Sequence, residues 1–171
     1  MEGKSGKGME KYRHEFKYFC SEGQLAILSA RLKGIMQAAS HAGREGRYHV
    51  KSLYFDDMDD RCLMENEDGT SPREKYRIRI YDNSRDRISL ECKRKENDKV
   101  NKKSSLLTMG QFEYLAYGYR TEEAEELPDL AKRLMVLKKC SGMQPKVVVS
   151  YERTPYVCKN GNVRVTFDRH I

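Results

Sequence analysis

Three short segments of this chain alternate residue by residue, as β-strands do, yet one face of each carries charge. Their charged positions, two residues apart, are Arg13-Glu15-Lys17, Lys75-Arg77-Arg79 and Glu91-Lys93-Lys95. A period of two places such residues on one face of a strand. In the second segment the intervening residues are Tyr76, Ile78 and Ile80, which we expect to pack. Such a sheet, with Arg, Lys and Glu on its polar face, favours a polyanion as ligand, above all a chain of phosphates.

A second interpretation of these charged faces stays open, because one face of many antiparallel sheets simply meets water. The overall charge is likewise compatible with an anionic partner or with a basic surface that meets only water. The chain has 171 residues, a net charge of +7 and a pI near 9.1. This balance favours an anionic partner, such as nucleic acid, a phosphorylated metabolite, polyphosphate or an acidic membrane surface. A merely basic surface is the alternative.

The cysteines and the hydropathy indicate a cytoplasmic protein. The five cysteines are widely spaced and form no CxxC pair, which argues against a zinc site or a redox motif. Free thiols are typical of a reducing compartment. No apolar run approaches the roughly 20 residues of a membrane span, and residues 1–9 lack the apolar core of a signal peptide. A membrane-bound partner remains compatible with this location.

The pattern of apolar residues predicts one α+β domain built on a curved antiparallel sheet or barrel. About seven strands are expected, and the clearest cover residues 12–19, 48–55, 73–81, 87–95, 146–153 and 163–168. Three helices are expected at 21–39, 108–117 and 128–140. Ser21 with Gln24 and Thr108 with Gln111 predict capping boxes, and Gly142 predicts a helix end. The acidic run 56–60 is expected to be a solvated turn, with a cation site as the alternative, although it lacks the spacing of an EF-hand.

If the charged strands close into a barrel, their polar faces meet inside it as a basic tunnel. Later strands add Arg153 and Arg164, and Arg164 shares a face with Asp168. Gathering like charges in this way costs free energy, which Glu15 and Glu91 offset in part. Such a tunnel suits a linear phosphate chain together with a divalent metal that bridges phosphate oxygens.

Seven motifs occur in an order that resembles a known family. They are RHEFKY, SLYFDD, KYRIRIYD, SLECKRK, NDKVNKK, PKVVVSYERTPY and VRVTFD, and they extend from Arg13 to Asp168. This order resembles the VTC domain, the catalytic domain of vacuolar transporter chaperone polyphosphate polymerases and of their bacterial relatives. That family belongs to the triphosphate tunnel, or CYTH-like, superfamily.

The resemblance implies an antiparallel β-barrel tunnel flanked by helices, formed by residues 11–171 after a flexible tail at 1–10. It implies transfer of the ATP γ-phosphate to a polyphosphate chain, with Mn²⁺ or Mg²⁺ as cofactor. Family members continue with a further strand resembling LEVK, which supplies a metal-binding carboxylate and a last tunnel lysine. This chain lacks that segment, so the resemblance implies a barrel that is open on one side.

The resemblance also assigns roles to residues of this chain. It implies that Arg77, Arg79, Arg153 and Arg164 are catalytic, clamping phosphates and stabilising the developing charge. It implies that Lys17, Lys93 and Lys102 bind the phosphate chain. Glu15 and Glu91 are the candidate metal ligands.

Three other functions remain open from the sequence. A tunnel triphosphatase usually carries Glu-x-Glu-x-Lys on its first strand, and the matching stretch here is Arg13-His14-Glu15-Phe16-Lys17, with one Glu replaced. A non-catalytic binder of polyphosphate or inositol phosphates is favoured by the missing last strand. Nucleic-acid binding is suggested by charge alone, and the chain has no RRM-type aromatic motif that would support it.

Overall fold

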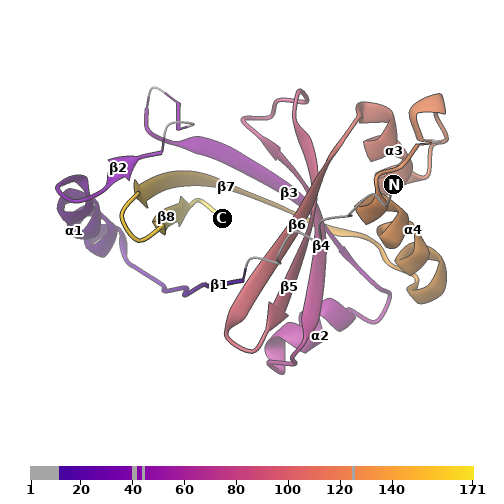
Figure 1. The fold of residues 1–171 in the computed structure, drawn as a ribbon, viewed down its shortest axis with the longest axis horizontal. Helices are drawn as coiled ribbons and strands as arrows, with labels where there is room; N and C mark the ends of the chain where they lie inside the picture. Colours follow the sequence, from indigo (N-terminus) through magenta and orange to yellow (C-terminus); the bar gives the residue numbers. More distant parts are fainter. Residues whose placement is uncertain (1–11, 40–41, 44, 125) are drawn as a thin grey trace, which may run out of the picture.

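The computed structural model of this chain describes residues 12–39, 42–43, 45–124 and 126–171. Within these ranges eight strands form one antiparallel sheet, which curls into a half-barrel (Figure 1). The α+β tunnel fold with an open side, expected from the sequence, is thereby confirmed. The predicted flexible tail, residues 1–10, lies outside the described residues.

The strands and helices follow in chain order. The strands are β1 (Arg13–His14), β2 (Gln37–Ala38), β3 (Tyr48–Asp56), β4 (Arg73–Tyr81), β5 (Ile88–Glu96), β6 (Lys99–Leu107), β7 (Gln144–Cys158) and β8 (Val163–Arg169). The helices are α1 (Glu22–Lys33), α2 (Arg61–Glu67), α3 (Met109–Tyr117) and α4 (Asp129–Ser141), with one 3₁₀ turn, η1 (Glu122–Ala124). The sheet order is β1-β6-β5-β4-β3-β7-β2, and β8 pairs with β7.

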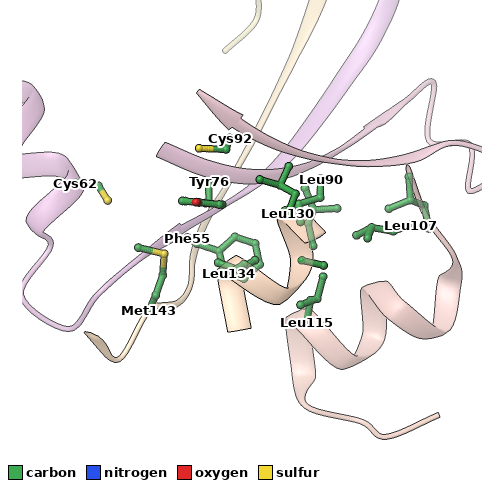
Figure 2. Close-up of a cluster of buried hydrophobic side chains, with 13 residues drawn as sticks. Phe55, Cys62, Tyr76, Leu90, Cys92, Leu107, Leu115, Leu130, Leu134 and Met143 are labelled. Atoms are coloured by element: carbon green, nitrogen blue, oxygen red, sulfur yellow. The ribbon is translucent and has the colours of Figure 1, made fainter. Parts of the chain in front are cut away.

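The main core lies between the convex face of the sheet and the helices α3 and α4. Tyr76 and Ile78, the apolar positions expected on β4, are buried there beside Phe55 of β3. Leu115 of α3 and Leu134 of α4 reach the same cluster, and Figure 2 shows these helices facing the strands across it. Burial of this face leaves the alternate residues of the same strands on the concave side.

A smaller cluster joins α1 to the far end of the sheet. Leu25 of α1 packs with Tyr156 of β7 and Phe167 of β8. The predicted capping box at Ser21 and Gln24 is present, but α1 ends at Lys33 and not near Ala39. The chain turns at Gly34, because residues 37–38 leave the helix to pair with β7 as β2. None of the helices in the described ranges is long and apolar enough to cross a bilayer.

Two other predictions from the C-terminal half are confirmed. Thr108 caps α3 and forms a capping box with Gln111. Gly142 ends α4 with a φ of 66°, in the left-handed region that favours glycine. The predicted strand at 146–153 is the middle of a longer one, since β7 begins at Gln144 and continues to Cys158.

The strand predicted at 12–19 is wrong beyond its first residues. Only Arg13 and His14 pair with β6, and residues 15–20 have no strand structure. In the described part of the chain no strand lies along the other edge of this segment. Phe16, Tyr18 and Phe19 are therefore exposed. An alternating pattern needs a neighbouring strand before it can form a ladder.

The turn predicted for the acidic run 56–60 is present before helix α2, but the prediction that it is solvated is wrong, because Asp56 and Asp57 are buried. The Asp56 carboxylate is buried and accepts hydrogen bonds from the backbone N–H groups of Asp57, Cys62 and Leu63, at 2.9, 2.8 and 3.1 Å. These bonds satisfy donors at the start of the helix that have no partner within it. One carboxylate thus organises a stretch that the sequence pattern made appear fully solvated.

Leu134→Ala is expected to lower the free energy of unfolding by about 2–5 kcal/mol, because it leaves a cavity in the main core. Urea denaturation monitored by circular dichroism measures the loss. Leu63→Ala is the matched control, since Leu63 on α2 is 49% exposed and should cost less than about 1 kcal/mol. Equal losses in the two variants would contradict the assigned core.

Candidate functional site

The concave face of the half-barrel is the candidate site, and a row of three lysines crosses it. Lys102 of β6 lies opposite Lys93 of β5, and Lys93 lies opposite Lys75 of β4. Like charges placed directly opposite one another destabilise a sheet. Burial lowers the pKa of Lys75 further than its charged neighbours do, and Arg73 adds to the decrease. The row therefore has a cost that an anionic ligand would remove.

Glu91 lies beside this row at the centre of the charged face. Its side chain is 2% exposed, and Oε2 accepts a hydrogen bond from Arg77 Nε at 2.8 Å and lies 2.6 Å from Arg77 Nη2 in an ion pair. Lys102 Nζ donates to Oε1 at 2.9 Å, and Arg79 Nη1 lies 3.9 Å from Oε2. Burial by itself raises the pKa of Glu91, but the charges of Arg77 and Lys102 lower it on balance. Glu91 is therefore ionised at neutral pH.

Arg79 is held beneath the surface of the concave face. It is 4% exposed, its Nε donates to Ser52 Oγ at 2.9 Å, and its Nη2 donates to Tyr151 Oη at 3.0 Å. Arg77 is fixed in a similar way, since its Nη1 donates to Tyr54 Oη at 2.9 Å. The burial of Arg79, and not a lack of donors, limits direct contact between this residue and a ligand.

Arg153 lies on β7, on the other side of Tyr151. Its Nε and Nη2 donate to the two carboxylate oxygens of Asp168 on β8, both at 2.6 Å. The guanidinium carbon lies 5.1 Å from the centre of the Tyr151 ring, and that of Arg79 lies 6.0 Å from it. Tyr151 thus contacts both arginines through its ring, an arrangement that favours cations. Asp168 raises the pKa of Arg153 despite its burial.

Glu15 ties the strandless segment 15–20 to the site. Lys93 Nζ donates to Glu15 Oε1 at 2.7 Å. Burial raises the pKa of Glu15, but Lys93 lowers it on balance. The pKa of Lys93 is lowered all the same, because burial lowers it more than the pairing with Glu15 raises it. Lys17 is exposed, and its positive charge contributes to this shift at Lys93.

The residues singled out in the sequence do not all meet. Arg77, Arg79, Lys93, Lys102 and Glu91 gather on adjacent strands, and Arg153 joins them through Tyr151. Glu15 reaches Lys93 from outside the strands. Arg164 is exposed and lies further along β8, opposite Val157, where its charge acts on Tyr48. No contact joins Arg164 to the Glu91 cluster within the described ranges.

The two candidate metal ligands do not fit a metal in this arrangement. Both oxygens of Glu91 accept hydrogen bonds from Arg77 and Lys102, and Glu15 is paired with Lys93. A divalent cation at Glu91 would lie beside several positive side chains, which repel it. Among the described residues no group of three or more His, Cys, Asp or Glu side chains is placed to hold a metal ion.

Sequence reasoning missed the neutral partners of the arginines. Ser52 and Tyr54 are two residues apart on β3, and Tyr151 precedes Arg153 by two on β7. The period of two would have placed them on the charged face once the faces of β3 and β7 were assigned. Asp168 was placed on the face of Arg164, but its bidentate pairing with Arg153 was not foreseen.

Asp168→Asn is expected to lower the free energy of unfolding by about 1–2 kcal/mol, because it weakens a charge-assisted bidentate pair. Thermal and urea denaturation measure the change. Asp129→Asn makes the same substitution where the carboxylate is fully exposed and 3.9 Å from Lys132, and its effect should be within about 0.5 kcal/mol. Equal effects would show that the Arg153–Asp168 pair contributes no stability.

Comparison with known proteins agrees with this geometry. The model of the VTC domain family matches residues 12–171, whereas no curated protein matches the chain. Among solved structures, a candidate adenylate cyclase from Bacillus halodurans is similar with a TM-score of 0.60. The two chains are 13% identical, and the similarity covers 95% of this chain and 74% of the other. At this identity the likeness concerns the fold, which is the triphosphate tunnel, or CYTH-like, fold.

The family match, the half-barrel and its basic concave face point to the same conclusion. Together they support a tunnel domain that binds phosphate groups or nucleotides. The chain belongs to the VTC domain family.

Proposed function

We propose that this domain binds a chain of phosphates on its concave face and transfers the ATP γ-phosphate to polyphosphate. The row formed by Lys75, Lys93 and Lys102 carries this proposal. A row of opposed lysines has a repulsive cost, and a string of anionic groups lying across it offsets that cost. Membership of the VTC domain family supports the polymerase activity.

Phosphoryl transfer asks for positioning and charge neutralisation more than for covalent catalysis. In the proposed reaction the lysine row neutralises the phosphate chain, and Arg77 and Arg153 stabilise charge that develops on the transferred group. Arg79, which is buried beneath the charged face, links β3 and β7 through its hydrogen bonds to Ser52 and Tyr151. The terminal phosphate of the acceptor chain is the nucleophile and needs no general base: one of its oxygens bonds to the γ-phosphorus, the bond between the β- and γ-phosphates breaks, and ADP leaves.

A non-catalytic phosphate-chain binder is the second candidate function. The observation that favours it is the pairing of Glu15 with Lys93 and of Glu91 with Lys102, so that neither of these two candidate ligands is free of a cationic partner. Incubation with ATP and Mn²⁺, followed by gel analysis, separates the candidates. Long-chain polymer supports the polymerase, release of free phosphate supports a triphosphatase, and tripolyphosphate binding without turnover supports the binder.

Lys102→Ala should weaken tripolyphosphate binding roughly tenfold, because it removes one charge next to the ligand and leaves Glu91 less neutralised. Isothermal titration calorimetry gives the affinity. Lys102 has a side chain that is 42% exposed, so the protein should remain folded. Lys139→Ala on α4 is the control, because it removes an exposed lysine from the opposite side of the sheet. Unchanged affinity in Lys102→Ala would remove the lysine row from the site.

Tripolyphosphate binding should weaken as the pH rises through the alkaline range. Lys75 and Lys93 have pKa values below the ordinary 10.5, and binding of an anion favours their protonated forms. Loss of those protons therefore lowers affinity, and binding at such pH values is coupled to proton uptake. Calorimetry in buffers of different ionisation enthalpy measures that uptake.

Lys93→Arg separates the lysine from other groups that titrate in the same range. An arginine stays protonated, so the alkaline loss of affinity should be smaller in this variant. Tyr54, whose pKa is lowered by Arg77 against the effect of burial, still titrates in both proteins. Affinity that does not change up to about pH 10 would contradict direct contact between the lysines and the ligand.

A further inference from the structure

Glu91 is an anion built into a site that is proposed to bind anions. Its side chain is among the largest fully buried ones in the described residues, and its carboxylate faces three positive side chains, Arg77, Arg79 and Lys102. The cluster therefore keeps two net positive charges. Without Glu91 the three cations would repel one another in a partly buried environment, where water screens charge less than in bulk solvent.

The hydrogen bonds show what Glu91 does to its neighbours. Arg77 directs both Nε and Nη2 at Oε2, and its Nη1 is bonded to Tyr54. These contacts fix the plane of the guanidinium and leave the Arg77 side chain only 16% exposed. Lys102, in contrast, reaches Oε1 with one of its three donors, and its side chain is 42% exposed. Lys102 can therefore hold Glu91 and a ligand at the same time.

We infer that Glu91 is a resident counter-anion and not a metal ligand: it positions Arg77 and Lys102, and its charge restrains the affinity of the concave face for phosphate chains. This inference rests on the proposed phosphate-chain binding. The observation behind the inference is that both Glu91 oxygens, expected to bind a metal, instead accept hydrogen bonds from Arg77 and Lys102. Phosphate groups then meet the side-chain cations directly, and binding does not depend on a metal held by Glu91.

The inference predicts the sign of the effect of removing the charge. Glu91→Gln keeps an oxygen that accepts from Arg77 but removes the negative charge that repels the ligand. Tripolyphosphate affinity should rise roughly tenfold, with EDTA present as well as with Mn²⁺. Glu91→Asp keeps the charge and shortens the side chain, so it should show no gain in affinity. Calorimetry on the whole chain measures all three proteins.

Glu74→Gln is the matched control. Glu74 also bridges two arginines, Arg94 at 3.4 Å and Arg133 at 2.7 Å, but it does so on the convex side near α4. The same change of net charge there should alter the affinity by less than about twofold. A rise of similar size in Glu74→Gln and Glu91→Gln would show that only the overall charge matters, and this would overturn the inference.

The outcomes separate the inference from the proposed function. If the wild-type chain binds no tripolyphosphate under either condition, both are wrong. If it binds and Glu91→Gln binds no more tightly, only the inference is wrong. Titration of the wild-type chain with Mn²⁺ alone is a second measurement that needs no folded Gln variant. Saturable Mn²⁺ binding that Glu91→Asp removes would establish a metal ligand and overturn the inference.

Discussion

The site depends on one constraint: positive side chains that face one another across a sheet must be offset or they repel. Glu91 supplies the offset for Arg77, Arg79 and Lys102, and Asp168 supplies it for Arg153. The lysine row across β4, β5 and β6 is offset only in part, through Glu15 and Glu91. The positive charge that these carboxylates do not offset remains available to attract an anionic ligand.

The core and the site are two faces of the same strands. On β4, Tyr76 and Ile78 pack against the helices, and Arg77 and Arg79 point to the other side. The helices α3 and α4 lie outside the half-barrel (Figure 1), so the concave face keeps its charges away from the main core. A rigid packed face behind the strands holds the charged side chains at the spacing of the ladder.

The sequence predicted correctly those features that depend on neighbouring residues, and it missed features that depend on contacts between distant segments. The strand 73–81 and the caps at Thr108 and Gly142 were predicted correctly, because alternation, capping and left-handed glycine are short-range effects. The strand at 12–19 failed beyond His14, since a strand also needs a neighbour. The burial of Arg79 rests on Ser52 and Tyr151, 27 and 72 residues away along the chain, and no local pattern reports such contacts.

Lysine acetylation followed by mass spectrometry, with and without saturating tripolyphosphate, tests most directly whether the concave face binds phosphate chains. We expect the ligand to protect Lys93 and Lys102 on the concave face, whereas Lys132 and Lys139 on α4 react equally in both samples. Protection that is uniform over the surface, or confined to α4, would contradict a phosphate-binding concave face.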